Sequence, residues 1–372
     1  MSRRVYIIAG EASGDLHAAN LVKALRRDHP EVELRGWGGD RMADAGVEVV
    51  KHIRELAFMG FAEVLLNLRT ILGNIAACKA DIAAWRPDAL VLVDYPGFNL
   101  RIATYARTLG IPVLYYISPQ VWAWKAGRVK RIRRDVTGMC VILPFERAWY
   151  AERGMDVTFV GHPLLDAIAE EEARPAAPVP GTDGRPVIAL LPGSRRQEVE
   201  RMLPVMLEAA AGVKDHQCVV AAAPALDDAV YAPLLAGRPA LVVRDRTYAL
   251  LRQARAALVT SGTATLETAL FGVPEVVCYG GSAVNVWLAR RLVKVPFISL
   301  VNLIMDRAVV REMIQQDLTP EALGAELERL LHDAPYRAAM QADLALLRER
   351  LGGPGASART AAQLWKILDR RP

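Results

Sequence analysis

The sequence predicts an α/β protein made of two doubly wound domains, each a parallel sheet with helices on both faces. Three observations support this fold class. The chain has 372 residues, which exceeds one ordinary core and suits two domains. Short apolar runs alternate with helical patterns along nearly all of its length. A stretch rich in proline and glycine, Glu170–Pro186, separates two such sets.

The first set consists of short apolar runs with helical patterns between them. Runs of this length, bounded by turn residues, predict strands that are buried on both faces. Helices are predicted at Leu16–Arg27 and Phe61–Trp85. In the second helix, apolar residues recur at i, i+3, i+4 and i+7 along the stripe Phe61, Val64, Leu65, Leu68, Leu72 and Ile75. The predicted strands are Val5–Ala9, Leu34–Trp37, Ala89–Val93, Val113–Ile117, Gly138–Ile142 and Val157–Val160.

The second set follows the proline-rich stretch, which we interpret as a hinge. We expect an N-terminal domain at 1–170, a linker at 171–186, a C-terminal domain at 187–345 and a helical tail at 346–372. Ligands of such folds bind at the carboxyl ends of the strands, so we expect a site where the two domains face each other across a cleft. The predicted strands are Val187–Leu191, Cys218–Ala222, Leu241–Val243, Ala256–Val259 and Val276–Tyr279.

Composition narrows the class of protein. The net charge of +5 is mild and does not by itself indicate nucleic-acid binding. The four cysteines are far apart in apolar surroundings, which favours buried free thiols in a reducing compartment. The first residues run straight into a strand pattern without a signal-peptide signature, and Thr108–Trp124 is too interrupted by proline and glycine to span a bilayer. We therefore expect a cytoplasmic protein.

The turn Gly10–Asp15 follows the first predicted strand and carries small residues. It matches neither the dinucleotide-binding nor the P-loop pattern. Carboxylates at Glu11 and Asp15 would repel a phosphate and suit sugar hydroxyls or proton transfer instead. The structural alternative is a tight turn capped by Ser13 or Asp15.

Two later strand-to-helix turns predict phosphate binding. The first phosphate loop, residues 192–198, places Gly193, Ser194 and Arg195 at the start of a helix. The free N–H groups and dipole of such a start attract anions, and a guanidinium suits phosphate oxygens. The second phosphate loop, residues 261–267, offers hydroxyls and backbone amides, and Glu267 lies a turn further on, where it could bind ribose. Together they suit one diphosphate. The alternatives are a plain helix start with solvated arginines for the first loop and a surface helix acid for Glu267.

Transfer of a sugar from a nucleotide needs charge stabilisation and a base. The chain has no D-x-D pair to hold a divalent ion, so we expect no metal and no cofactor, with helix N-termini and Arg195 carrying the charge. The proposed base is Asp94, because it ends the apolar strand Ala89–Val93. Glu11, Asp15 and His17 are rivals that the sequence does not rank.

A strip at Val121–Arg134 contains six basic residues, no acid and two leading tryptophans. Such a strip suits anionic lipid headgroups, and the nearby apolar segment Leu56–Phe61 suits an acyl chain or a bilayer. The alternative is a solvated helix face. No RNA-binding module accompanies the strip, so we expect no nucleic-acid partner.

Seven motifs in this order resemble the lipid-A-disaccharide synthase family over residues of about 5 to 315. They are Gly10–Asp15, Met59–Val64, Ser118–Trp124, Leu143–Glu146, Gly161–Pro163, Leu191–Arg195 and Ser261–Glu267. The resemblance implies a GT-B glycosyltransferase of two Rossmann-like domains. It would join UDP-2,3-diacylglucosamine to 2,3-diacylglucosamine 1-phosphate (lipid X), giving a β(1→6) disaccharide 1-phosphate and UDP at the inner face of the inner membrane.

Residue roles follow from the resemblance by position. Asp94 would be the base. The UDP-binding residues would be Ser194, Arg195, Glu198, Ser261, Gly262, Thr263, Glu267 and Asn302. The acceptor or lipid side would include Gly10, Ser13, Gly14, Phe58, Met59, Phe61, Trp122, Trp124, Lys125 and Arg128.

Two other functions remain open at this stage. The same architecture serves a UDP-N-acetylhexosamine 2-epimerase, which would need no lipid. A membrane-surface or nucleic-acid-binding module without catalysis would rest on residues 121–134 alone. The sequence also leaves open a homodimer and an exchange of the tail between chains.

Overall fold

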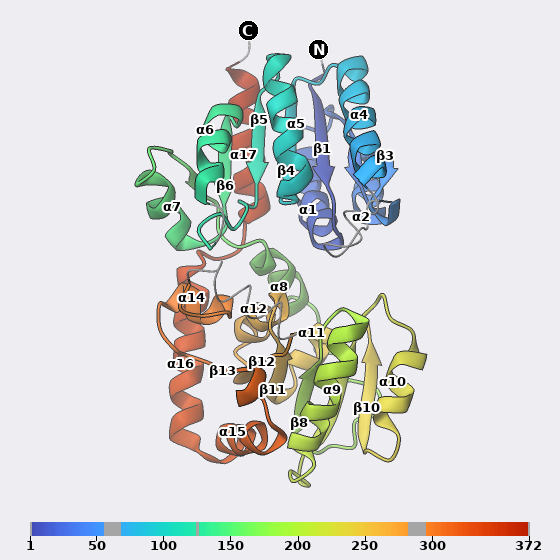
Figure 1. Ribbon diagram of the computed structural model, residues 1–372, viewed down its shortest axis with the longest axis vertical. Helices are drawn as coiled ribbons and strands as arrows, with labels where there is room; N and C mark the ends of the chain where they lie inside the picture. Colours follow the sequence, from blue (N-terminus) through green and yellow to red (C-terminus); the bar gives the residue numbers. More distant parts are fainter. Residues whose placement is uncertain (1, 56–67, 124–125, 282–294, 371–372) are drawn as a thin grey trace. The chain divides into compact units, whose positions relative to one another are not determined.

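The chain folds into two compact units. The structure, a computed structural model, describes residues 2–55, 68–123, 126–281 and 295–370 (Figure 1). Unit 1 is Met1–Asp166 together with Gly352–Pro372, and unit 2 is Ala167–Leu351. In these described ranges, no helix is both long enough and apolar enough to cross a bilayer.

Unit 1 is built on a seven-stranded parallel sheet in the order β3-β2-β1-β4-β5-β6-β7. The six strands predicted for this half are present. The additional strand, β3, lies at the edge of the sheet and is only partly buried, so its sequence lacks a continuous apolar run. The strands are β1 (Arg4–Ala9), β2 (Glu33–Gly38), β3 (Glu48–His52), β4 (Ala89–Val93), β5 (Val113–Tyr116), β6 (Gly138–Val141) and β7 (Thr158–Phe159).

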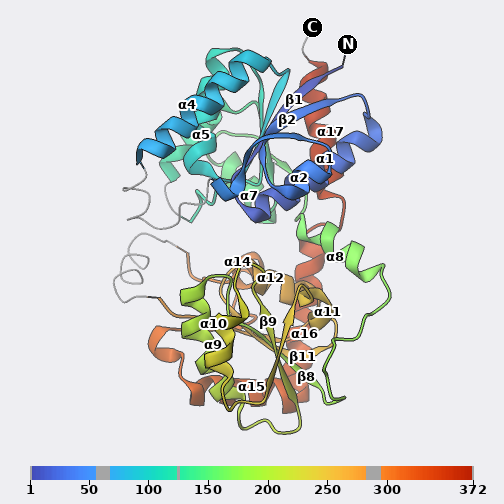
Figure 2. The ribbon, with the colours of Figure 1, turned by 90° about the vertical axis from the view of Figure 1, so that its right-hand side faces the viewer.

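Helices cover both faces of this sheet, because alternate residues of each strand point to opposite sides. Tyr6 and Ile8 of β1 belong to the core shared with α4, α5, α6 and α7, whereas Val5 and Ile7 belong to the core shared with α1 and α17. Figure 2 shows α4 and α5 on one side of the sheet and α1 and α17 on the other. The helices are α1 (Ala12–Asp28), α2 (Asp40–Asp44), α4 (Leu68–Trp85), α5 (Pro96–Thr108), α6 (Val129–Asp135), α7 (Pro144–Ala151) and α17 (Ala356–Asp369).

The C-terminal helix α17 is part of unit 1, which differs from the separate tail expected at 346–372. Leu364 and Leu368 are fully buried in the core of that unit. The Asp166 carboxylate accepts hydrogen bonds from the backbone N–H groups of Gly355 and Ser357 and so caps the start of α17. The last helix therefore completes one face of a sheet whose first strand lies at the other end of the chain.

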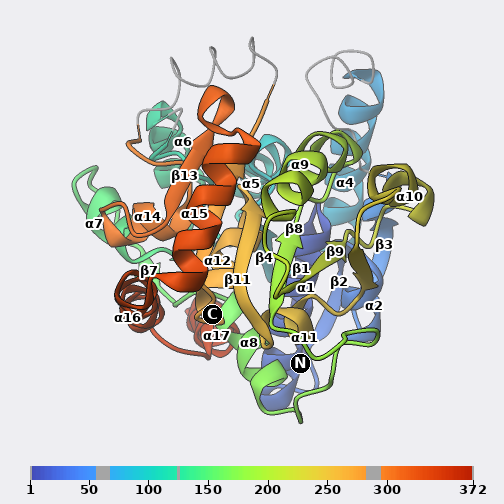
Figure 3. The ribbon, with the colours of Figure 1, turned by 90° about the horizontal axis from the view of Figure 1, so that it is seen from below.

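Unit 2 repeats the plan with a six-stranded parallel sheet in the order β10-β9-β8-β11-β12-β13. Figure 3 shows α9 and α15 on one side of this sheet and α11 and α12 on the other. The five strands predicted here are present, and β13 is an additional edge strand. The strands are β8 (Val187–Leu191), β9 (Gln217–Ala222), β10 (Ala240–Arg244), β11 (Ala254–Thr260), β12 (Glu275–Tyr279) and β13 (Arg311–Ile314). The helices are α8 (Leu164–Glu172), whose first residues belong to unit 1, α9 (Arg196–Ala210), α10 (Asp228–Leu235), α11 (Thr247–Leu251), α12 (Thr263–Leu270), α14 (Leu300–Met305), α15 (Pro320–His332) and α16 (Ala334–Arg350).

The proline-rich stretch expected as a linker at 171–186 lies within unit 2 and packs against it. Val179 is 1% exposed and joins the core beside β8. The Gln253 side chain donates a hydrogen bond to the carbonyl of Ala177. The units divide instead within α8, after Asp166, and again between Leu351 and Gly352.

The helix expected at Phe61–Trp85 is described only from Leu68 onward, as α4. Its buried positions are Ile75, Cys78 and Ile82. Leu72, which the predicted apolar stripe included, is instead 55% exposed. Ile71, one position before Leu72, packs partly buried against the same core, and the stripe residues Phe61, Val64 and Leu65 lie outside the described residues.

Candidate functional site

Several of the predicted site residues follow four strands, at the points where the strand order of each sheet reverses. In unit 1 the order reverses between β1 and β4, and in unit 2 between β8 and β11. Loops after such strand pairs diverge to opposite faces and leave a crevice at the carboxyl edge of the sheet, where ligands of doubly wound proteins bind. The strand ends are direct neighbours: Ala9 pairs with Val93, and Leu191 pairs with Val259.

Asp94 follows β4 in an unusual backbone conformation. Its φ is 43° and that of Tyr95 is 47°, so two successive non-glycine residues are left-handed. Such a conformation costs about 1–3 kcal/mol per residue and persists only where neighbours impose it. Burial, and next the charge of Glu11, raises the pKa of the Asp94 carboxyl to about 6. A carboxylate with that pKa is largely ionised at neutral pH and is a stronger base than an ordinary aspartate.

The turn after β1 packs closely on the turn after β4. A Cβ at Gly10 would lie 2.4 Å from the ring of Tyr95, so this contact requires glycine. Glu11 and Ser13 are exposed at the start of α1, whereas Gly14 is buried against Ala9. The structure thus packs the turn that holds Gly10 and Glu11 against the turn that holds Asp94, with Glu11 exposed and Asp94 half-buried.

The carboxylate of Asp15 is used in hydrogen bonds within the protein, unlike that expected of a catalytic base. The residue is buried, and its carboxylate accepts hydrogen bonds from the backbone N–H groups of Gly39, Arg41 and Met42 at distances of 2.7, 3.1 and 3.2 Å. These groups begin α2, so Asp15 caps that helix. This role of Asp15 is neither the cap of its own turn nor the rival base that the sequence suggests.

His17 is also unsuited to act as the base. It is buried, and burial lowers the pKa of its imidazole to about 4, so the ring is neutral at pH 7. Its pKa lies further below neutrality than that of Asp94, which makes it a weaker proton acceptor.

In the first phosphate loop, the anion position at the start of α9 holds a carboxylate of the protein itself. Glu198 Oε2 accepts hydrogen bonds from the backbone N–H groups of Ser194 (3.0 Å) and Arg195 (3.2 Å). Its Oε1 lies 3.2 Å from the Arg195 guanidinium. Gly193 has φ +114°, and a Cβ there would lie 2.7 Å from the Glu198 side chain. The N–H groups predicted to bind phosphate are here occupied by the Glu198 carboxylate, and phosphate binding by this loop stays a prediction.

The second phosphate loop is more open. Gly262 precedes α12 without a side chain that could cap it, and Gly262 and Thr263 are exposed. Among the described residues no carboxylate hydrogen-bonds to the first turn of α12. Because Ser261 follows β11 and the first phosphate loop follows the neighbouring β8, both helix starts lie at one edge of the sheet. The open helix start can therefore accept phosphate oxygens directly.

Glu267 lies one turn into α12, and its side chain accepts a hydrogen bond from another residue of unit 2. The hydroxyl of Tyr248, on α11, donates a hydrogen bond of 2.9 Å to its Oε1. Burial raises the pKa of the Glu267 carboxyl. The second oxygen, Oε2, is the one that a ribose hydroxyl could contact.

Asn302 is expected to contact UDP, but its side chain already forms a full set of hydrogen bonds within the protein. The residue is 1% exposed. Its amide nitrogen donates to the carbonyl of Val310 and to Glu312, and its Oδ1 accepts from the N–H groups of Val309 and Val310. These four bonds exhaust the capacity of the side chain. Asn302 therefore fixes the turn before β13, and direct contact with a ligand would require breaking one of these bonds.

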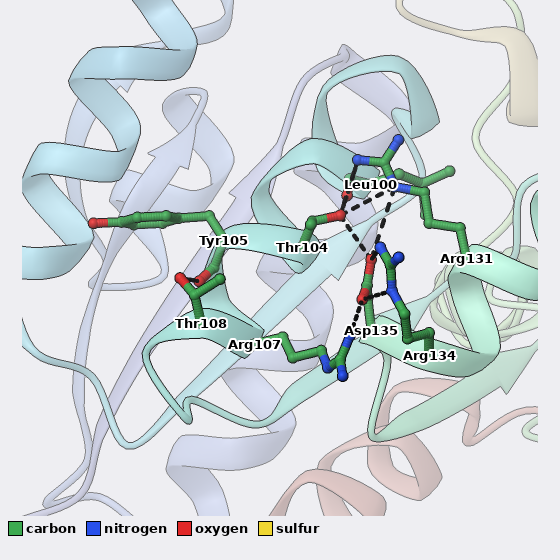
Figure 4. A network of polar contacts seen from close by, with 8 residues as sticks. All are labelled: Leu100, Thr104, Tyr105, Arg107, Thr108, Arg131, Arg134 and Asp135. Atoms are coloured by element: carbon green, nitrogen blue, oxygen red, sulfur yellow. Dashed lines mark hydrogen bonds and ion pairs between the residues drawn. The ribbon is translucent and has the colours of Figure 1, made fainter.

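The basic strip is partly neutralised by an acid just beyond it. The side chain of Asp135 is 1% exposed and forms ion pairs with Arg107, Arg131 and Arg134 (Figure 4). Thr104 joins the network by donating to Asp135 and accepting from Arg131. Several arginines of this region therefore have structural partners, which supports the solvated-face alternative for part of the strip.

The aromatic part of the strip is only partly described. Trp122 is half-buried with its ring edge-on to Phe145, at 5.0 Å between centroids. Arg128 is half-buried at the start of α6. The residues predicted for the lipid side at Phe58, Met59, Phe61, Trp124 and Lys125 lie outside the described residues.

A buried polar cluster connects two of the motifs, and the sequence did not predict it. The Ser118 hydroxyl lies 2.8 Å from the hydroxyl of Tyr150. The buried carboxylate of Glu146 accepts from the N–H groups of Ile142 and Leu143 and so caps α7. Burial raises the pKa of Glu146 to about 7. The clue in the sequence was the acid at the third position of a helix that begins with proline.

Within the described ranges, no three His, Cys, Asp or Glu side chains are grouped so that they could hold a metal ion. The acids at the two switch points differ in their contacts. Asp15 and Glu198 accept hydrogen bonds from backbone N–H groups at helix starts, whereas Asp94 caps neither of these helices.

Solved structures share the fold at low sequence identity. The glycosyltransferase of kitacinnamycin has a TM-score of 0.70 at 17% identity, with 99% of this chain and 100% of that chain covered. The UDP-GlcNAc 2-epimerase from Neisseria meningitidis has a TM-score of 0.61 at 12% identity, with 99% and 100% covered. At such identities the likeness shows the fold alone. It is the GT-B fold of two Rossmann-like domains, as the sequence predicted.

Sequence relatives are more specific. The family model described as lipid-A-disaccharide synthetase matches residues 5–366. The lipid-A-disaccharide synthase of Trichlorobacter lovleyi is 44% identical over 375 residues, covering 99% of this chain and 98% of that protein. The synthase of Geobacter metallireducens is 43% identical over 378 residues, covering 100% and 98%. The chain belongs to the lipid-A-disaccharide synthase family and is a glycosyltransferase of lipid A disaccharide synthesis.

The two aspartates of unit 1 should respond differently to mutation. Asp15→Ala removes the acceptor for three backbone N–H groups, so we expect a loss of about 1–3 kcal/mol in the free energy of unfolding, measured by urea denaturation. Asp94→Ala should leave that free energy within about 1 kcal/mol of wild type. Among the described residues, its carboxyl group has only the backbone N–H of the next residue, Tyr95, as a donor. Equal losses in both variants would contradict the assignment of Asp15 as a cap.

Proposed function

We propose that the protein transfers 2,3-diacylglucosamine from UDP to the 6-hydroxyl of 2,3-diacylglucosamine 1-phosphate (lipid X), with inversion, giving the β(1→6) lipid A disaccharide 1-phosphate and UDP. Family membership supports a sugar nucleotide and a lipid as substrates. Two observations support this role, one in each unit: a half-buried carboxylate with a raised pKa follows β4 in unit 1, and an open helix start follows β11 in unit 2.

In this proposal unit 2 binds UDP. The start of α12, with Ser261, Gly262 and Thr263, holds the diphosphate through backbone N–H groups. Arg195 adds a guanidinium, and Glu267 holds the ribose. As UDP leaves, these fixed dipoles and the cation stabilise its developing charge. The negative carboxylate of Glu198 has to move away from the Ser194 and Arg195 amides for phosphate oxygens to replace it there.

Unit 1 binds the acceptor in the same proposal. Asp94 takes the proton from the 6-hydroxyl while the oxygen attacks the anomeric carbon. Burial, and next the charge of Glu11, keeps the pKa of Asp94 raised. Gly10, Ser13 and Gly14 form the turn beside it. We further propose that the cations at 125–134 and the apolar segment 56–61 contact the anionic surface of the inner membrane, at its cytoplasmic face.

The reaction itself is tested by incubating the purified protein with both lipid substrates and EDTA, then separating the products by thin-layer chromatography. We expect disaccharide 1-phosphate and UDP, formed only when both lipids are present. Conversion of the UDP-sugar without lipid X would favour an epimerase instead. Loss of activity with EDTA and its recovery with magnesium or manganese would refute the proposed metal independence.

Asp94→Ala should retain UDP binding and lose turnover. The variant removes a base whose contribution to rate is roughly 10²–10⁴-fold. Calorimetry should give a UDP dissociation constant within about twofold of wild type, since UDP is assigned to unit 2. Asp94→Asn, which tolerates the left-handed backbone, is the matched variant and should behave the same way. Normal turnover in either would remove Asp94 from its role.

Arg195 and Glu198 should affect UDP affinity in opposite directions. Arg195→Ala removes a charge-assisted hydrogen bond and should weaken UDP binding roughly tenfold. Glu198→Gln removes the competing negative charge and should tighten it by a factor of about three to ten. Arg196→Ala is the control, because Arg196 pairs with Glu200 on the exposed face of α9. A weaker affinity in Glu198→Gln would show that Glu198 binds UDP directly.

A further inference from the structure

We infer that Asn99 and Tyr115 are positioning residues for the reaction: they hold the backbone of Asp94 in its left-handed conformation and so fix the position from which its half-buried carboxyl group acts. The inference rests on the proposed role of Asp94 as the base. Neither side chain belongs to the predicted site, and both reach Asp94 from other elements of the fold, Asn99 from α5 and Tyr115 from β5.

The two side chains converge on one backbone carbonyl. The Tyr115 hydroxyl donates a hydrogen bond of 2.5 Å to the carbonyl oxygen of Asp94. The Asn99 amide nitrogen donates to the same oxygen at 2.8 Å and to the carbonyl of Val93 at 3.1 Å. Together these bonds use both lone pairs of the Asp94 carbonyl. They therefore determine the direction of the peptide unit that follows Asp94.

The other side of the residue is fixed by the sheet. The N–H group of Asp94 donates to the carbonyl of Tyr116 at 3.0 Å, which continues the pairing of β4 with β5. Since the groups on both sides of its Cα are held, φ and ψ of Asp94 have little freedom. These contacts stabilise a left-handed turn that is uncommon at two successive non-glycine residues such as Asp94 and Tyr95.

Both donors are themselves immobile. Asn99 and Tyr115 are fully buried, and Tyr115 belongs to the core on the α5 side of the sheet. Asn99 also belongs to the first turn of α5, where its own N–H donates to the carbonyl of Tyr95. The Cα of the residue that carries the carboxyl group is therefore held in place. A base needs such a fixed position to reach a hydroxyl at hydrogen-bond distance.

Removing one donor should release the turn without removing the base. In Tyr115→Phe the ring that fills the core is kept and the hydroxyl is lost. The Asp94 carboxyl can then turn toward water, which weakens the burial that raises its pKa. We expect kcat to fall roughly tenfold or more. The acidic limb of the pH profile, which we expect near pH 6 in wild type, should move to lower pH by about half a unit or more.

Tyr116→Phe is the matched control. Tyr116 is the next residue of β5, equally buried, but it belongs to the core on the opposite face of the sheet. Its hydroxyl has no hydrogen-bond partner among the described residues. We expect this variant to keep the wild-type kcat and acidic limb.

Asn99→Ala removes both hydrogen bonds that the side-chain amide donates to the carbonyls of Val93 and Asp94. It should shift the acidic limb in the same direction as Tyr115→Phe.

The outcomes separate this inference from the proposed function. If wild type makes no disaccharide, or if Asp94→Asn is fully active, the proposed function or its base fails. If wild type is active with a limb near pH 6 and Asp94→Asn is inactive, but Tyr115→Phe retains the wild-type kcat and limb, the positioning inference fails alone. The inference is also overturned if kcat falls in Tyr115→Phe while the acidic limb stays in place and the melting temperature falls as well. That result would describe a general loss of stability and not a change at Asp94.

Discussion

The structure depends on the pairing of two non-consecutive parallel strands in each sheet, β1 with β4 and β8 with β11. This pairing reverses the strand order and sends successive helices to opposite faces, so that the loops after the central strands are left uncovered at the carboxyl edge. Glycine at position 10 and the left-handed pair Asp94–Tyr95 are local adjustments to that arrangement. Both phosphate loops and the proposed base owe their positions to it.

A second theme is the use of acids as helix caps near the candidate site. Asp15 caps α2, Glu146 caps α7, Asp166 caps α17 and Glu198 lies at the start of α9. Each satisfies backbone N–H groups that have no partner within their helix. The start of α12 differs, since no carboxylate of the described residues contacts it. The presence of a carboxylate therefore does not by itself indicate a catalytic base in this fold. Asp94, the proposed base, differs from Asp15 in its contacts and from Glu11 in its burial.

Some features could not be predicted from local sequence for clear physical reasons. The edge strands β3 and β13 are half-exposed and mix charged with apolar residues, so they lack the signal of a buried strand. The stretch at 171–186 has the composition of a linker, yet Val179 finds a place in the core of unit 2. Asn302 carries a side chain suited to ligand binding, but four internal hydrogen bonds occupy it.

By itself the sequence determined the two parallel sheets, the loops that carry Asp94, Ser194 and Ser261, and the family, because apolar runs and turn residues are local and the motifs are contiguous. The tertiary structure decided which polar side chains are already in use. It assigned Asp15 to a cap and α17 to unit 1, and it placed Asn99 and Tyr115 on the carbonyl of Asp94. Such choices depend on contacts between segments distant along the chain, and local pattern does not encode them.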